Sequence, residues 1–181
     1  MEVENDDVLL DKLATNDWSS MNLIFKQYYK TVYYSAMRIL SDMSIADDIS
    51  QEVFIDLWSK RTEIKVQTNL EAYLRKMAVN KSLNYIRDNK KISFSVELDD
   101  QQSSNEPDYI QNENFREIKE LLYNAIDKLP PQCKIIFVLS RFEDYSNKMI
   151  AQHLDISIKT VENQMTKALK ILRNVSENFY R

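Results

Sequence analysis

The sequence predicts an all-α protein of two small helical domains, joined by an acidic flexible linker, with a helix-turn-helix in the C-terminal domain. Apolar residues recur three and four positions apart along most of the chain, as they do on one face of a helix, and no comparable strand-like alternation is present. A polar, acidic stretch divides this pattern. We therefore expect one domain over residues 1–95, the linker over 96–112 and a second domain over 113–181.

The helical spacing gives the expected elements in order. They cover residues 21–40, 45–58, 70–86, 115–129, 135–142, 148–154 and 158–172. The predicted linker contains Pro107 and has no apolar periodicity. Such a composition is typical of a segment that cannot bury enough apolar surface to fold by itself.

The segment 45–58 predicts a helix with one packed side and one outer side. Ser44, with Asp47 three residues later, forms an approximate capping box at its start. The packed side is expected to hold Ile45, Ile49, Val53, Phe54, Leu57 and Trp58. The outer side is expected to hold Asp48, Gln51, Glu52 and Ile55. An isoleucine among acid and amide groups favours a protein-binding patch, although single exposed apolar residues are also ordinary.

Composition excludes several classes of function. The chain has no glycine, so phosphate-binding loops and dinucleotide fingerprints are excluded. His153 is the single histidine, which argues against multi-histidine metal sites, and Cys133 is expected to be a small buried hydrophobe. We expect no cofactor, no metal and no enzymatic activity. The acidic start MEVENDD and the lack of a long apolar run predict a cytoplasmic protein without direct membrane insertion.

Charge is distributed unevenly along a chain whose net charge is −4. Residues 1–59 carry −7 and residues 60–92 carry +6, while residues 93–131 carry −6 and residues 132–181 carry +3. Because exposed charges are screened over about 10 Å, a locally basic face can meet phosphates despite an acidic total. Each predicted domain therefore has one basic block suited to nucleic acid.

The basic block of the first domain forms a stripe on one helical face. Its members follow one another at spacings of three and four: Tyr73, Lys76, Asn80, Asn84 and Arg87. An aromatic ring among cations and amides suits single-stranded nucleic acid, since rings stack on bases while cations follow the backbone. The alternative is a partly buried Tyr73 beside a solvated face.

The segment 148–172 predicts a helix-turn-helix. A short helix over 148–154 is followed by Asp155, Ile156 and Ser157, then by a second helix. Asp155 suits the turn because short polar side chains enter left-handed backbone conformations readily. On the second helix, Ile158, Val161, Met165, Ala168, Leu169 and Leu172 are expected to pack, opposite Lys159, Asn163, Lys167 and Lys170. A helical hairpin that only packs remains the alternative.

Three segments in this order resemble the extracytoplasmic-function sigma factors of the sigma-70 family. They are ADDISQEVFIDLW at 46–58, AYLRKMAVNKSLNYIR at 72–87, and LPPQCKIIFVLSRFEDYSNKMIAQHLDISIKTVENQMTKALKILR at 129–173. The resemblance covers nearly the whole chain. It implies a sigma factor that binds bacterial core RNA polymerase and directs initiation from promoter DNA by recognising minus-ten and minus-thirty-five elements. It also implies that the two domains are sigma-70 regions 2 and 4.

The resemblance further implies roles for individual residues. Asp48, Gln51 and Glu52, with Ile55, would face the clamp helices of the polymerase beta-prime subunit, and the second domain would meet the beta flap. The minus-ten contacts would come from Ile64, Lys65, Asn69, Tyr73, Lys76, Asn80, Asn84 and Arg87, with a flipped base of the non-template strand captured near 64–69. The minus-thirty-five contacts would come from Lys159, Thr160, Glu162, Asn163, Lys167 and Lys170. A membrane-linked anti-sigma factor is a further implied partner.

The chain departs from the family pattern at two places. Met149 stands where the first helix of the motif commonly has a glutamate, and Glu162 stands where the recognition helix often has a basic residue. Promoter sequence preferences therefore do not transfer. Two other classes remain open: a conventional helix-turn-helix repressor or activator, which leaves the 45–58 patch without a task, and a protein-binding helical adaptor, which leaves the two basic blocks unexplained.

Overall fold

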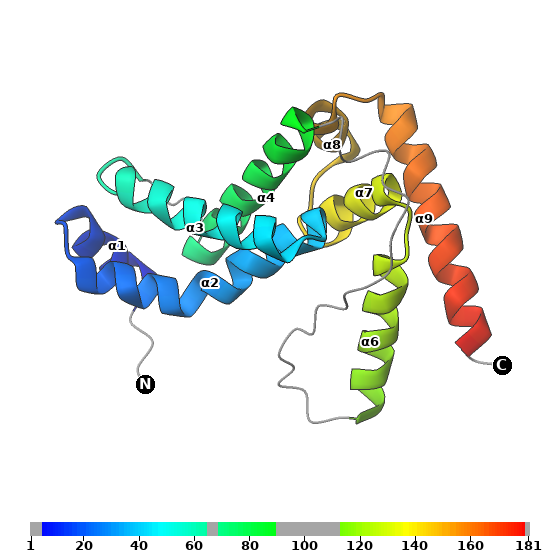
Figure 1. The fold of residues 1–181 in the computed structure, drawn as a ribbon, viewed down its shortest axis with the longest axis horizontal. Helices are drawn as coiled ribbons and strands as arrows, with labels where there is room; N and C mark the ends of the chain where they lie inside the picture. Colours follow the sequence, from blue (N-terminus) through cyan, green and yellow to red (C-terminus); the bar gives the residue numbers. More distant parts are fainter. Residues whose placement is uncertain (1–4, 65–68, 90–112, 180–181) are drawn as a thin grey trace. The chain divides into compact units, whose positions relative to one another are not determined.

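The computed structural model describes residues 5–64, 69–89 and 113–179, and these residues form two compact helical units (Figure 1). The first unit ends at Asp88 and the second contains the C-terminal helices. The predicted linker over 96–112 lies outside the described residues. The all-α fold class and the division into two helical domains are confirmed.

The described residues of unit 1 form four helices: α1 (Asp6–Ala14), α2 (Trp18–Leu40), α3 (Met43–Ser59) and α4 (Leu70–Asp88). The long helix α2 packs against each of the other three, and α3 also packs against α4. Three small residues are fully buried in these helices: Ser20, Ser50 and Ser82. Each donates its hydroxyl hydrogen to a backbone carbonyl three or four residues earlier in the chain. Helix α2 is thus the centre of the unit.

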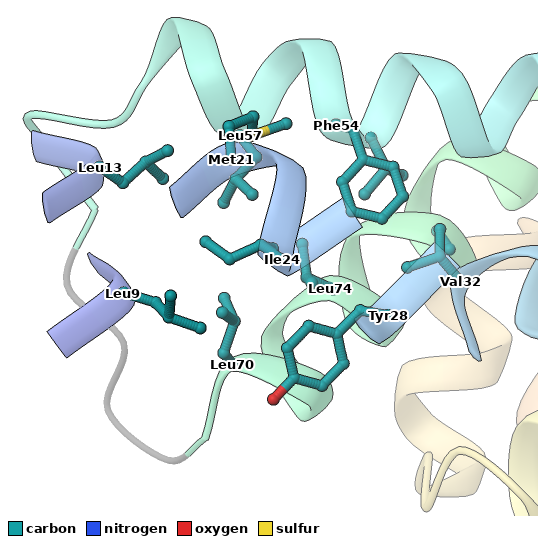
Figure 2. Packing of buried hydrophobic residues seen from close by; sticks show 12 residues of the cluster. Leu9, Leu13, Met21, Ile24, Tyr28, Val32, Phe54, Leu57, Leu70 and Leu74 are labelled. Carbon is teal, nitrogen blue, oxygen red and sulfur yellow. The ribbon is translucent and has the colours of Figure 1, made fainter. Parts of the chain in front are cut away.

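The main core of unit 1 draws side chains from all four helices (Figure 2). Its buried members are Leu9, Leu13, Met21, Ile24, Tyr28, Val32, Val53, Phe54, Leu57, Leu70, Leu74 and Ala78. A second, smaller cluster of Ala36, Met37, Ala46 and Ile49 continues the packing between α2 and α3. The apolar spacing that predicted the helices therefore also identified the sides that are buried.

Helix α1 was not predicted, because its apolar stripe is short and is surrounded by acidic residues. It nevertheless has its own start signal, since the Asn5 side chain accepts a hydrogen bond from the backbone N–H of Asp7 at 3.1 Å. Leu9 and Leu13 are completely buried in the main core. A nine-residue helix is marginal alone, so tertiary packing stabilises it.

The predicted capping box at Ser44 and Asp47 is wrong. Helix α3 begins at Met43, and Asp42 is its cap, because the Asp42 carboxylate accepts from the backbone N–H groups of Ser44 at 2.9 Å and Ile45 at 3.1 Å. An aspartate two residues earlier than Ser44 satisfies two of the helix's free N–H groups and leaves Asp47 available for a tertiary contact. Asn69 has the same capping function at α4, where its Oδ1 accepts from the backbone N–H of Ala72 at 2.7 Å.

Unit 2 contains α6 (Glu113–Asp127), α7 (Pro131–Arg141), α8 (Asn147–Leu154) and α9 (Ile158–Phe179). Helix α7 is its most buried element, with every residue from Cys133 to Leu139 inaccessible or nearly so. It packs against α8 and α9, and α9 packs in turn against α8 and α6. Lys134 lies in this buried run and is paired with Asp127 of α6 at 2.7 Å.

The chain makes its tight turns without glycine. Left-handed backbone conformations are taken by Asn16, Ser41, Asp144 and Asp155, with φ between 55° and 67°. Short polar side chains tolerate this region better than other non-glycine residues. Asp155 ends α8 with φ 55° and ψ 50°, as predicted for the turn of the helix-turn-helix.

Leu74→Ala should destabilise unit 1 by about 2–5 kcal/mol, because it leaves a cavity among side chains of the main core. Leu74 is completely buried, whereas Leu23 on α2 is 41% exposed. Leu23→Ala is therefore the matched control and should cost far less. Urea unfolding monitored by circular dichroism measures both changes, and equal losses would contradict this description of the core.

Asn69→Ala should lower the stability of unit 1 by about 1 kcal/mol, because α4 loses the side chain that caps its first turn. Asn69→Ser retains an acceptor oxygen and should recover most of that loss. Thermal unfolding of the three proteins compares them. If the serine variant were as unstable as the alanine variant, the capping contact would not be a source of stability.

Candidate functional site

The four residues of the predicted protein-binding patch lie together on the outer side of α3. Asp48, Gln51, Glu52 and Ile55 are all exposed, and Ile55 is 64% accessible, more than any other large apolar residue described. The opposite side of α3 is buried through Ile49, Val53, Phe54 and Leu57. Residues at spacings of three and four share a helical face, so an apolar centre is surrounded by acid and amide groups.

The polar rim of this patch is held in place by neighbours. The Gln51 amide donates to the Asp47 carboxylate at 2.9 Å, and Asp47 also accepts the hydroxyl hydrogen of Tyr29 on α2. Burial, followed by this hydrogen bond, raises the pKa of Tyr29 to about 12, so the phenol stays a donor at neutral pH. The Gln51 side chain is therefore oriented from α2 through Asp47.

Lys81 of α4 connects the patch to the next helix. Its ammonium group lies 2.9 Å from the Glu52 carboxylate and 3.0 Å from that of Asp56. Burial alone would lower the pKa of Lys81, but the two carboxylates raise it, and the lysine remains charged. This tertiary contact between α3 and α4 could not be seen in either helix alone.

An aromatic cluster around Trp58, near the C-terminal end of α3, was not identified from the sequence. The rings of Trp18 and Trp58 meet edge to face at 4.7 Å, and the Arg61 guanidinium lies 4.5 Å from the centre of the Trp58 ring. Arg61 also donates to Asn16 at 2.6 Å and to the Trp58 carbonyl at 2.8 Å. Trp18 is 59% exposed. The signal in the sequence was two tryptophans, Trp58 at the end of the predicted helix 45–58 and Trp18 three residues before the predicted helix 21–40.

The basic stripe on α4 is partly a core element and partly a solvated face. Tyr73 is half-buried and packs against the main core, which agrees with the alternative that the sequence left open. Lys76, Asn84 and Arg87 are exposed, and Asn80 is half-buried. Arg87 pairs with its neighbour Asp88 at 3.1 Å on the surface, a contact of little energetic weight.

The segment before α4 contains the remaining predicted minus-ten residues. Ile64 is half-buried and packs against the main core, while Asn69 is exposed and caps α4. Lys65 lies outside the described residues. The Asn69 side-chain carbonyl is already used within the protein, so its amide NH₂ is the group suited to an outside acceptor.

Helix α9, the second helix of the helix-turn-helix, presents the predicted polar face. Lys159, Glu162, Asn163, Lys167 and Lys170 are exposed and Thr160 is half-buried. Glu162 is exposed, with its carboxylate 3.4 Å from the Lys159 ammonium. Ser157 starts the helix by accepting from the Thr160 N–H at 3.0 Å, and its hydroxyl lies 2.9 Å from that of Thr160.

The packed side of α9 is narrower than predicted. Val161 and Ala168 are completely buried, whereas Ile158 is 46% and Leu169 is 41% exposed. The expectation that Ile158 and Leu169 pack inside unit 2 is therefore wrong. Beside this apolar packing, α9 makes polar contacts with α7: the buried Cys133 thiol donates to Gln164 at 2.9 Å, and Gln164 donates to Gln132 at 3.0 Å.

The described residues contain no cluster of three or more His, Cys, Asp or Glu side chains arranged to hold a metal ion. None of the helices described in them is long and apolar enough to cross a membrane.

The chain matches two family models. The model described as Sigma-70 region 2 matches residues 24–92, and the model described as Sigma-70, region 4 matches residues 119–172. The first match contains the α3 patch and the α4 stripe, and the second contains the helix-turn-helix. Helix α1 lies outside both matches.

Relatives match along nearly the full chain. The ECF RNA polymerase sigma-E factor of Haemophilus influenzae is 22% identical over 178 residues, which cover 93% of this chain and 94% of that protein. The RNA polymerase sigma factor YlaC of Bacillus subtilis is 23% identical over 163 residues, covering 88% of this chain and 94% of that protein.

A solved structure shares the fold. The sigma factor RpoE of Bartonella quintana, determined with the anti-sigma factor NepR, has a TM-score of 0.54 at 16% identity, with 84% of this chain and 94% of that chain covered. With both family regions present in order and full-length relatives of one kind, the chain belongs to the sigma-70 family and is an extracytoplasmic-function sigma factor that directs promoter recognition by RNA polymerase.

Proposed function

We propose that this sigma factor contacts core polymerase through the α3 patch, the minus-ten element through α4 and the segment before it, and the minus-thirty-five element through α9. The observation that supports this proposal best is the segregation of chemistry within unit 1. The acid and amide groups around Ile55 lie on α3, and the cations and amides lie on α4. One small unit thus has separate faces for a protein and for a nucleic acid.

The α3 patch suits a helical, basic partner such as the beta-prime clamp helices. An exposed apolar centre with a polar rim is the usual anatomy of a protein interface. Glu52 and Asp48 supply negative charge, and the Asp47 contact fixes the Gln51 amide before a partner arrives. A rim that is already ordered loses less conformational entropy on binding.

The α4 face suits the separated non-template strand of the minus-ten element. Lys76 and Arg87 offer charge to phosphates, while Asn69, Asn80 and Asn84 offer amides to base edges. Tyr73 can contribute the exposed part of its ring to stacking, and its buried part fixes the position of that ring. A base can be captured here only after the strands part.

The face of α9 suits the major groove of the minus-thirty-five element. Residues near the N-terminus of a recognition helix meet base edges, which here are Lys159, Thr160, Glu162 and Asn163. Lys167 and Lys170 lie one to two turns later and meet phosphates. The exposed Leu169 and Ile158 leave apolar surface on unit 2 for a protein contact such as the beta flap.

The remaining assignments follow from the same function. We assign region 2 to residues 1–95 and region 4 to residues 113–181, joined by 96–112. Promoter recognition requires a cytoplasmic location. An anti-sigma factor is the proposed regulator, since the similar RpoE of Bartonella quintana was solved with the anti-sigma factor NepR. We propose that the regulator of this chain is linked to the membrane.

Run-off transcription with purified core polymerase tests the function, and Ile55→Lys tests the patch. The parent protein should initiate from its own promoter, while the variant should lose affinity for core polymerase by about tenfold or more, because a charge replaces the apolar centre. This substitution leaves the Lys81 contacts of Glu52 and Asp56 intact. Leu23→Lys, at an exposed position on α2, is the control. Normal core binding by the Ile55 variant would remove the patch from the mechanism.

Asn163→Ala and Lys167→Ala should fail differently at the minus-thirty-five element. The Asn163 variant should change which base is preferred, with a loss of about 1–3 kcal/mol at one base pair. The Lys167 variant should weaken all sequences alike and reduce the salt dependence by about one phosphate contact. Initiation across a randomised minus-thirty-five library at several salt concentrations compares them. A uniform loss for Asn163→Ala would contradict this division.

A further inference from the structure

The carboxylate of Asp6 in α1 joins two elements that are far apart in the sequence. Its Oδ1 accepts the Tyr28 hydroxyl hydrogen at 2.5 Å, and its Oδ2 accepts from the backbone N–H of Leu70 at 3.4 Å. Tyr28 belongs to α2, and Leu70 is the first residue of α4. One side chain from α1 therefore holds the starting point of α4 against the central helix.

Apolar packing supports this polar contact. Figure 2 shows Leu9 of α1 and Leu70 of α4 within the main core, and both are completely buried there. The Tyr28 ring is buried beside them, and its hydroxyl also accepts from the Gln27 amide at 2.9 Å. The position of the Tyr28 oxygen is thus fixed by burial and by two hydrogen bonds, which makes it a firm support for Asp6.

The contact acts on the part of α4 that carries the base-capture residues. Asn69 immediately precedes Leu70 and caps the helix, and the Tyr73 backbone N–H donates to the Asn69 carbonyl at 3.2 Å. The first N–H groups of a helix have no partner within the helix, so an acceptor from outside determines how the first turn is held. Asp6 supplies that acceptor at Leu70, between the two candidate DNA-binding side chains.

We propose that Asp6 is a positioning residue for capture of an extruded minus-ten base, acting through Leu70 on Asn69 and Tyr73; this inference rests on the minus-ten function proposed for α4. The ligand is a single unpaired base of the non-template strand. A binding site for one flat base needs its side chains held to within about 0.5 Å, which a helix end fixed from outside provides. Helix α1 thus becomes part of the promoter-binding machinery, although it lies outside the region 2 match.

Holoenzyme binding to a fork-junction promoter tests the proposal. The non-template minus-ten strand is used intact and with each base removed in turn, which identifies the captured base in the parent protein. On intact DNA, Asp6→Ala should weaken binding about tenfold. Asp6→Asn keeps the shape but offers one oxygen to two donors, and it should weaken binding about threefold. Asp7→Ala removes the same charge from an exposed neighbouring position and should bind normally.

The abasic DNA separates positioning from general damage. Where the captured base is missing, the parent and Asp6→Ala holoenzymes should bind equally, since the variant loses only what that base contributes. An equal loss on intact and abasic DNA would overturn the role of Asp6 while leaving base capture standing. A parent protein that is indifferent to every base removal would overturn base capture and this inference together.

Affinity for core polymerase and thermal unfolding complete the comparison. Asp6→Ala should bind core polymerase normally, because the α3 patch does not contact Asp6. If Asp6→Ala fails to fold, the outcome rests on Asp6→Asn and on Tyr28→Phe, which removes one hydrogen bond without a change of charge. Either variant must show a loss that is confined to DNA containing the captured base, and a loss of core affinity of the same size would contradict the proposal.

Discussion

The burial of three amphipathic helices, α1, α3 and α4, around α2 is the constraint on which unit 1 depends. Full burial of one leucine stabilises a fold by about 1.5–3 kcal/mol, and Leu9, Leu13, Leu57, Leu70 and Leu74 are all completely buried. Because these side chains fix the rotation of each helix about its axis, they also decide which residues face outward. The exposed patch on α3 and the stripe on α4 are the reverse sides of the same core.

Polar contacts then determine how side chains of neighbouring helices are paired, which apolar packing alone does not determine. Surface ion pairs contribute little to stability, so the pairing of Lys81 with Glu52 and Asp56 matters more for geometry than for free energy. It ties α3, which carries the proposed protein-binding patch, to α4, which carries the proposed DNA-binding stripe. The Asp6 contact instead joins α1 to α2 and to the start of α4.

The acidic character of the chain is compatible with its function. Free affinity for DNA falls when few phosphates are neutralised, and the exposed pairing of Lys159 with Glu162 further reduces the positive charge on the recognition helix. A sigma factor acts together with core RNA polymerase, so the charge of this chain need not supply all of the affinity for DNA.

The sequence by itself determined every described helix except α1, and most of their buried residues, because a spacing of three and four carries both kinds of information. It also determined the left-handed turn at Asp155, since few residues tolerate that conformation. It could not determine α1, whose short stripe is stable only in contact with α2 and α4. Nor could it show that Asp42 caps α3, because a capping residue is identified by its hydrogen bonds and several polar residues preceded the helix.

Only the tertiary structure decided which outward residues are already engaged. Glu52 meets Lys81 across 29 positions of sequence, and Asp6 meets Leu70 across 64. Such pairs depend on how helices cross, which local periodicity does not encode. The same reason explains Ile158 and Leu169: their spacing placed them on the apolar side of α9, but the neighbouring helices cover only the part of that side centred on Val161 and Ala168.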